Sequence, residues 1–390
     1  MKSPRPSLRQ VAAYFLKLGA TGFGGPVALA NYMRKDLVDR YGWLDGSEYD
    51  EGLAIATACP GPLAYQLGIY CGYVTHGLAG ALSVAFAFAA GPFAIVCAIA
   101  ALYVRFGSTW ELRALFYGIG PVVVGLIFKS CWDLGRKTLR REQLAWTFAV
   151  VAGVVTVLVQ KELTAIFLVA GALGIFLFAP RPEERAAKPD KLDATRPLPS
   201  VTLPAIFPLA LPVVSSSKIF LFFLKTGFLV FGSGLVVVPF LKAYVVDQYH
   251  WLDDRTFLDA VAIGIISPGP VVITATFVGY VLNNMPGALA ATAGIFLPSL
   301  VFVIFGTPIL LRYRRHRRVQ GFVRGITVAV VGVLVGTSLL VAKGTVLDWI
   351  SAALLALSLA LLFSKWKIPE QALIGAGAIA GLSLAPFVHP

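Results

Sequence analysis

The chain has 390 residues, of which 57% are hydrophobic and only 14% are charged, and its mean hydropathy is +0.78. A soluble globular domain carries about a quarter charged residues, so this composition excludes that class and indicates a polytopic membrane protein. The net charge of +13 does not indicate a nucleic-acid partner, because the basic residues stand in short loops between apolar stretches, as in the cytoplasmic loops of membrane proteins.

The first half of the chain contains six apolar stretches, each close to the roughly 20 residues that a membrane-spanning helix needs. A basic start with Lys2, Arg5 and Arg9 precedes them. A glycine cluster at 22–26 interrupts the first stretch, and the polar segment 34–51 after it keeps aromatic residues suited to the membrane interface. The six predicted spans are 11–33, 53–73, 77–104, 114–131, 144–160 and 163–179.

A charged, proline-rich linker separates this half from a second half with the same pattern. We therefore predict an all-α membrane protein in three parts: an N-terminal repeat (1–180), a linker with a candidate connecting span (181–217), and a C-terminal repeat (218–390). The connecting stretch 201–217 is apolar but contains three prolines. The predicted spans of the second half are 219–246, 257–282, 288–311, 322–342, 346–363 and 372–387.

The basic loops predict that the two halves have opposite orientations. In the first half, four basic residues lie between 136 and 141, after the fourth span. In the second half, six arginines lie between 312 and 324, after the third span. If both loops face the cytoplasm, equivalent spans cross in opposite directions, which makes the halves inverted repeats and requires 201–217 to be a thirteenth span. The alternative is twelve spans with one basic loop outside.

The two halves are copies of one another. A shift of 208 residues aligns 15–62 with 223–270 without a gap, and 17 of the 48 aligned positions are identical. The shared pattern comprises FLK-x-G, then FG, then D-x-Y-x-WLD, then PGP. Duplication is therefore the strongest inference that the sequence supports.

Each half has a Pro-Gly-Pro tripeptide, here called a joint, in the middle of its second apolar stretch. Proline within a helix removes a backbone donor and clashes with the preceding turn, so each stretch should form two half-helices with an unwound connection. Freed backbone groups at membrane depth are tolerated only where they are buried in protein or line a wet cavity. Two facing half-sites are therefore predicted at the first joint (Pro60, Gly61 and Pro62) and the second joint (Pro268, Gly269 and Pro270).

An oxyanion is the ligand that such half-sites suit, because the N-terminus of a half-helix offers free amide groups and partial positive charge. Tyr65, Gln66 and Thr274 follow the joints; their polar groups are predicted either to bond the anion or to satisfy backbone freed by the prolines. Lys17 and Lys225 lie at equivalent positions within apolar stretches. Two explanations for a lysine there are equally favoured: that it binds the anion, or that its side chain snorkels to the membrane interface.

The glycine clusters are further candidates, because they allow amide groups to face a ligand, although close helix packing is the stronger interpretation for them alone. Their candidate residues are Phe23, Gly24, Gly25, Pro26, Phe231, Gly232 and Ser233. The repeated Tyr-x-Trp-Leu-Asp motif is interpreted as an interface anchor, with a proton-handling carboxylate as the less favoured alternative.

No motif indicates a cofactor, a metal ion or an enzyme active site. The four cysteines lie in or beside apolar stretches without CxxC spacing, which favours small buried fillers over disulfides or zinc ligands. The carboxylates are expected in loops rather than converging within spans. An intramembrane enzyme would need convergent acid, base or nucleophile groups, and the sequence offers none.

The paired motifs resemble those of the bacterial chromate ion transporter family in its two-domain form. The resemblance rests on FGGP at 23–26, WLD at 43–45, PGP at 60–62 and GY at 72–73, with their copies in the second half. The second copy departs from FGGP, with Ser233 and Gly234 in place of Gly25 and Pro26. The similarity covers nearly the whole chain outside the linker.

This resemblance implies a multi-pass secondary transporter of the bacterial inner membrane, with antiparallel halves, that expels chromate, confers chromate resistance and accepts sulfate as an analogue. The expected partners are chromate or a sulfate-like oxyanion and the lipid bilayer, with a homodimer left open. We expect the dianion to sit between the two joints while the halves rock about it. An oxyanion uptake transporter and an anion channel remain alternatives.

Overall fold

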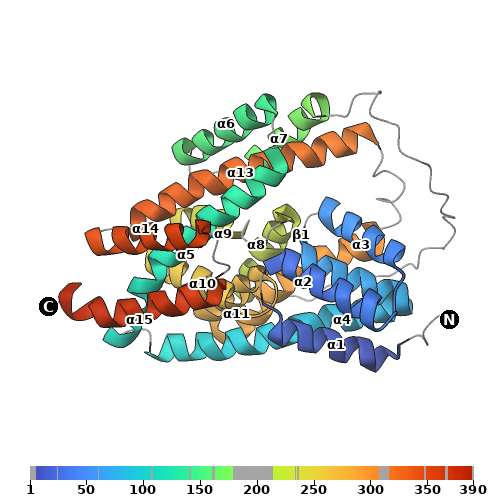
Figure 1. Cartoon of the computed structure of the whole chain (residues 1–390), viewed down its shortest axis with the longest axis horizontal. Helices are drawn as coiled ribbons and strands as arrows, with labels where there is room; N and C mark the ends of the chain where they lie inside the picture. Colours follow the sequence, from blue (N-terminus) through green and yellow to red (C-terminus); the bar gives the residue numbers. More distant parts are fainter. Residues whose placement is uncertain are drawn as a thin grey trace.

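The computed structural model describes most of the chain, in the ranges 6–23, 25–59, 61–106, 109–139, 142–159, 163–178, 214–232, 234, 237–306, 316–346, 348–364 and 368–388. Three candidate residues, Gly24, Pro60 and Ser233, lie outside these ranges, as do the linker and most of the predicted connecting span. The described residues are almost entirely helical (Figure 1).

The first half contains seven described α-helices and one π-helical segment. They are α1 (Leu8–Thr21), α2 (Gly25–Met33), η1 (Arg34–Arg40), α3 (Gly46–Ala58), α4 (Leu63–Phe106), α5 (Trp110–Leu139), α6 (Gln143–Val159) and α7 (Leu163–Leu177), with the short strand β1 (Gly61–Pro62) before α4.

The second half repeats this order. Its elements are α8 (Ser216–Leu229), β2 (Phe231–Gly232), α9 (Val237–Phe240), η4 (Leu241–Gln248), α10 (Asp254–Ile266), η5 (Val271–Ile273), α11 (Thr274–Val301), η6 (Phe302–Gly306), α13 (Arg317–Thr345), α14 (Trp349–Phe363) and α15 (Glu370–Val388). Helices α1 and α3 match α8 and α10 residue for residue at the spacing of 208. The duplication inferred from sequence is therefore present in the structure.

The aspartate of each Trp-Leu-Asp motif begins a helix. Asp45 is the N-cap of α3 and forms a capping box with Glu48, while the side chain of Asp253 accepts a hydrogen bond from the Thr256 amide at 2.8 Å at the start of α10. Such caps satisfy amides that have no partner within the helix.

Each joint separates two helices that fold back against one another. Helix α3 ends at Ala58 and α4 begins at Leu63, so the predicted break is confirmed. The two helices are not successive halves of one straight span, however, because Gly52 of α3 packs directly on the Tyr70 ring of α4. The joint is the tip of a helical hairpin, and a 13-residue helix such as α3 rises only about 20 Å, less than the bilayer core.

A second reversal occurs within α4, at His76 and Gly77. Gly77 has φ +61°, and beyond it the chain returns along itself, so that Gly72 packs against Gly80 and the Tyr65 hydroxyl donates to the Ala85 carbonyl at 3.1 Å. Helix α11 has the equivalent reversal at Asn283 and Asn284. The predicted spans 53–73 and 77–104 are therefore joined by a tight turn between two arms of α4.

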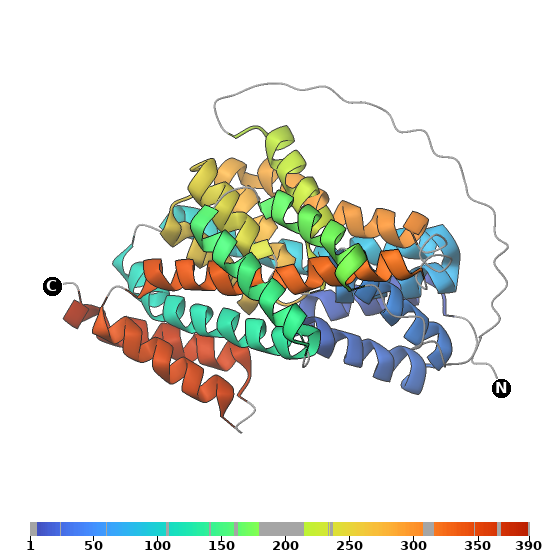
Figure 2. The same ribbon diagram turned by 90° about the horizontal axis from the view of Figure 1, so that it is seen from above.

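The later helices of the two halves interlock. Helix α5 packs against α14 and α15, and its counterpart α13 packs against α6 and α7; Figure 2 shows α6 and α7 (green) lying against α13 (orange-red). Helices α5 and α13 also contact each other and run antiparallel, since residues later in α5 meet residues earlier in α13. The contacts are Tyr117 with Asp348 beyond the end of α13, Cys131 with Ser338, and Glu142 with Arg324.

Four stretches among the described residues are long and apolar enough to cross a membrane: Leu63–Phe106, Trp110–Leu139, Val271–Gly306 and Arg317–Thr345. In the first and third, the arm after the reversal alone supplies this length. Helices α6, α7, α14 and α15 are apolar but shorter. The protein is thus an integral membrane protein. All four of its cysteines are buried as free thiols.

Candidate functional site

The two joints are held by the opposite halves of the chain. The Gly61 amide of the first joint donates to the Val230 carbonyl at 2.5 Å, and the Gly269 amide of the second joint donates to the Gly22 carbonyl at 2.9 Å. These bonds are equivalent, because each partner is related to its counterpart by 208 residues. Each joint therefore meets the glycine cluster of the other repeat, and the two halves exchange contacts symmetrically.

The first joint forms a short parallel ladder with the second glycine cluster. Strand β1 pairs with β2, with Gly61 opposite Phe231 and Pro62 opposite Gly232. Two residues further on, Gly234 packs against the start of the helix after the second joint, at Val271 and Val272. The second glycine cluster thus connects the first joint to the N-terminus that follows the second joint, and the structure brings these predicted segments together.

Glycine is required at the centre of each joint. Gly61 has φ +133° and Gly269 has φ +89°, conformations that a side chain rarely adopts. A β-carbon at Gly61 would displace the side-chain ends of Gln66 and Ser299, and one at Gly269 would lie 2.5 Å from Cγ of the Pro92 ring. The joints are therefore packed tightly against the other half.

Gln66 and Ser299 place polar groups beside the first joint. Both residues are fully buried, and the Ser299 hydroxyl has no hydrogen-bond partner among the described residues. Leaving a buried hydroxyl unsatisfied costs about 1 to 3 kcal/mol, which favours a ligand or water at this position. Sequence reasoning identified Gln66 but missed Ser299, because its repeat equivalent is Pro92 and no shared motif marks it.

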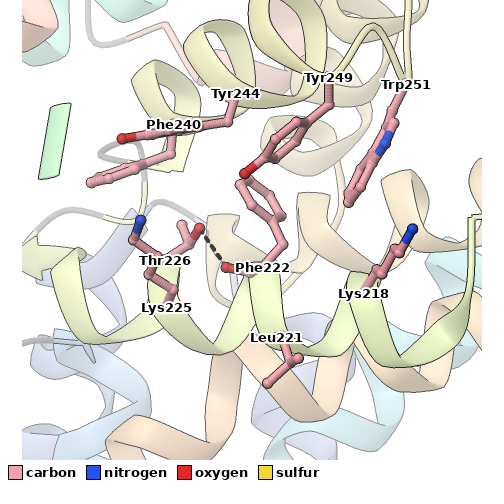
Figure 3. Close-up of a pocket in the computed structure, with 9 residues that line it drawn as sticks. All are labelled: Lys218, Leu221, Phe222, Lys225, Thr226, Phe240, Tyr244, Tyr249 and Trp251. Carbon is pink, nitrogen blue, oxygen red and sulfur yellow. Dashed lines mark hydrogen bonds between the residues drawn. The ribbon is translucent and has the colours of Figure 1, made fainter. Parts of the chain in front are cut away.

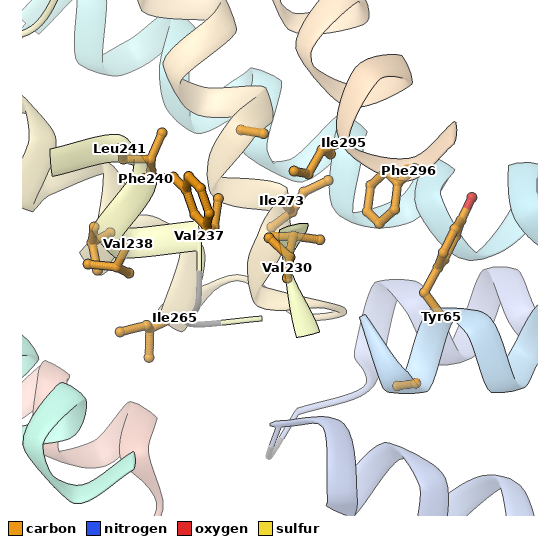
Figure 4. Close-up of a cluster of buried hydrophobic side chains, with 14 of the residues drawn as sticks. Tyr65, Val230, Val237, Val238, Phe240, Leu241, Ile265, Ile273, Ile295 and Phe296 are labelled. Carbon is orange, nitrogen blue, oxygen red and sulfur yellow. The ribbon is translucent and has the colours of Figure 1, made fainter. Parts of the chain in front are cut away.

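Buried apolar side chains lie near the first joint, whose Gly61 amide bonds the Val230 carbonyl. Figure 4 shows Val230 beside Ile273 and Ile295, and the ring of Tyr65 near that of Phe296. The Tyr65 and Phe296 ring centroids are 4.4 Å apart, and both residues are buried. An apolar shell excludes water, so amide and hydroxyl groups inside it act more strongly on an anion.

The hydroxyls of Tyr65 and Thr274 are engaged with the backbone. Tyr65 donates to the Ala85 carbonyl, and Thr274 donates to the Val271 carbonyl at 2.8 Å in the turn after the second joint. Both hydroxyls therefore act as donors to carbonyls within helical segments, and the part that either residue plays at the joints stays a prediction.

Lys17 and Lys225 have exposed side chains on α1 and α8. Lys225 borders a cavity of about 490 Å³ between α8 and the segment 240–251, where its Nζ lies 5.5 Å from the centroid of the Tyr244 ring. Figure 3 shows the lysine on one wall and aromatic side chains on the other. Lys225 therefore lies beside an aromatic cavity, and Lys17 lies on the outer surface. Neither lysine belongs to the hydrogen-bonded joints.

The remaining candidates are distributed around the joints. The side chain of Phe23 is exposed, and Gly25 and Pro26 are half-buried at the start of α2. Pro62, Pro268 and Pro270 are buried. No group of three or more His, Cys, Asp or Glu residues within the described ranges is arranged to hold a metal ion.

One carboxylate departs from the sequence expectation. Asp259 lies within α10 rather than in a loop, is only 3% exposed, and accepts a hydrogen bond from the Tyr103 hydroxyl at 2.6 Å. Its presence inside the predicted span 257–282 was the available clue, and the expectation that the carboxylates stand in loops does not hold for this residue.

Comparison with known proteins identifies the family. The family model described as chromate transporter matches residues 9–175 and 217–382. The chain is 42% identical over 387 residues to the chromate transport protein of Cupriavidus metallidurans, covering 99% of this chain and 96% of the relative. It is 38% identical to a probable chromate transport protein of Synechococcus elongatus, covering 97% and 96%, and no solved structure matches it. The chain therefore belongs to the chromate transporter family.

Proposed function

We propose that this protein exports chromate across the bacterial inner membrane by alternating access and thereby confers chromate resistance. The observation that carries the proposal is the reciprocal pair of hydrogen bonds from Gly61 to Val230 and from Gly269 to Gly22. It places the two joints in equivalent positions between the repeats, where a movement of one half relative to the other would open or close both. Chromate is proposed as the substrate because a similar protein is named a chromate transport protein.

The expected ligand groups are amides and hydroxyls rather than buried cations. Helix α4 begins directly after Pro62, and a 3-10 turn leads from Pro270 into α11, so free amides lie beside each joint. Such N-termini favour a dianion. Ser299 adds a buried hydroxyl beside the first joint, and sulfate, with the same charge and tetrahedral shape, is expected to compete.

Opposite orientation of the repeats supports alternating access. Helices α5 and α13 are equivalent and antiparallel, so if both cross the bilayer they do so in opposite directions. This agrees with the basic loops and favours inverted repeats. Inverted repeats commonly place a substrate near the midplane between them.

The membrane potential supplies a driving force for export. Moving one charge through 100 mV is worth about 2.3 kcal/mol, so a dianion leaving a cell that is negative inside gains about 4.6 kcal/mol per 100 mV. Uptake of the same ion would have to oppose this energy.

The test is chromate accumulation by inside-out membrane vesicles with an imposed potential, positive in the lumen. We expect wild-type vesicles to accumulate chromate and vesicles with Pro268→Ala to accumulate far less, because alanine would let α10 continue through the joint. Expressing cells should also contain less chromium than control cells. Higher chromium in expressing cells would instead establish the uptake alternative, and equal accumulation by the variant would remove the joint from the pathway.

A further inference from the structure

A buried carboxyl lies where the two halves meet, away from the joints. Asp259 of α10 belongs to the second half, and Tyr103 of α4, whose hydroxyl donates to Asp259 Oδ2 at 2.6 Å, belongs to the first. The aspartate is 3% exposed. The repeat-equivalent residue is Glu51, which is half-buried in α3, so the buried carboxyl exists in one repeat only.

The carboxyl and the second joint both contact the second arm of α4. Gly269, ten residues after Asp259, packs against Pro92, eleven residues before Tyr103. The second arm of α4 therefore meets the second half at two places, the joint and the carboxyl, which are about 15 Å apart along the arm. Any separation of the halves at this contact would also expose the carboxyl.

Burial makes the charged form of Asp259 costly. An isolated carboxylate in an apolar interior is so unfavourable that it tends to take up a proton, and ionisable groups inside membrane proteins commonly belong to proton pathways. The groups that act on it are Tyr103 from α4 and, from its own hairpin, Arg255 and Asp253. Arg255 has an exposed side chain and leaves the carboxyl without a buried counter-ion in its helix.

We propose that Asp259 binds and releases one proton in each transport cycle and so couples chromate movement to proton movement. While α10 is packed against α5 and α11 and Tyr103 of α4 is bonded to it, the carboxyl is shielded from water and holds the proton. When the halves separate, the carboxyl becomes hydrated and releases it. This proposal rests on the transport function proposed above, and it adds a driving ion to that function.

The test uses the full-length protein in proteoliposomes, with the membrane potential clamped at zero and a gradient of one pH unit. Coupling to one proton changes the wild-type chromate accumulation ratio about tenfold, in the direction that distinguishes co-transport from exchange. Asp259→Asn, which keeps the acceptor for Tyr103, should remove this response but retain chromate exchange at equal pH on both sides. Glu51→Gln, the repeat equivalent, should keep the tenfold response.

Tyr103→Phe provides a second test if Asp259→Asn does not fold. It removes the donor that stabilises the carboxylate, so the pH midpoint of transport should move to a higher value. Wild-type transport without any response to the gradient, a full response in Asp259→Asn, or an unchanged midpoint in Tyr103→Phe would overturn proton coupling. Absence of chromate flux in the wild type would instead contradict the transport function itself.

Discussion

Replacement of Gly269 by alanine tests whether the shape of the second joint is needed for transport. At φ +89°, alanine is strained by about 1 to 2 kcal/mol. Its β-carbon would also lie 2.5 Å from Cγ of Pro92 and 3.3 Å from the Gly19 carbonyl oxygen, and such overpacking costs about 1 to 3 kcal/mol.

Together these terms disfavour the observed joint by about 2 to 5 kcal/mol, which reduces its population roughly 30-fold to 5,000-fold relative to alternative conformations. The assay is the initial rate of chromate uptake by inside-out vesicles, normalised to the amount of protein in the membrane. We expect Gly269→Ala to lose at least 30-fold in rate.

The matched control is Gly77→Asn. Gly77 also has positive φ, at +61°, but a β-carbon there would meet no atom within 4 Å, and the equivalent position already carries Asn284 at φ +46°. This variant should transport at nearly the wild-type rate. If Gly269→Ala were as active as Gly77→Asn, the reasoning about the joint would be refuted.

Three further predictions concern other parts of the molecule. Ser299→Ala should raise the KM for chromate roughly 10- to 100-fold, because it removes a hydrogen bond to a charged ligand. Ser338→Ala removes a hydroxyl already bonded to the Leu334 carbonyl and should leave KM unchanged. An equal KM in both variants would exclude Ser299 as a ligand. Lys225→Gln should weaken uptake by about 1 kcal/mol at low ionic strength, and by less at high salt, because an exposed charge attracts the dianion only over a Debye length. A loss that persists at high salt would indicate direct binding. Lys17→Gln, at the equivalent position of the first repeat, is the control. The pKa of Asp348 is lowered from 3.8, because desolvation that would raise it is outweighed by hydrogen bonds from the Ser351 amide and the Tyr117 hydroxyl. Its contribution to stability is therefore complete above about pH 4 and lost as the pH falls further, so thermal unfolding in detergent between pH 5 and 3 should depend less on pH in Asp348→Asn than in wild type.

Much of the helix pattern follows from local sequence. The spacing of 208 residues predicted that α1 would match α8 and that α3 would match α10, and proline chemistry predicted the breaks at both joints. Helix boundaries of this kind depend on nearby residues, such as the capping Asp45 and Asp253, and a repeated local sequence therefore repeats them.

The features that depend on distant contacts did not follow from the sequence. A joint ends a helix without revealing whether the next helix continues or turns back, and the packing of Gly52 on Tyr70 decides this in favour of a hairpin. The exchange of partners between Gly61 and Val230 requires knowledge of both halves at once. The pairing of Asp259 with Tyr103, 156 residues away, could not be predicted for the same reason.

The most direct test of the central claim, that both joints serve one anion pathway with alternating access, is the uptake of labelled chromate by proteoliposomes with and without unlabelled chromate inside. The account predicts saturable uptake that internal chromate accelerates and that Gly61→Ala and Gly269→Ala each abolish. Uptake that rises linearly with concentration, ignores internal anion and survives both substitutions would contradict it.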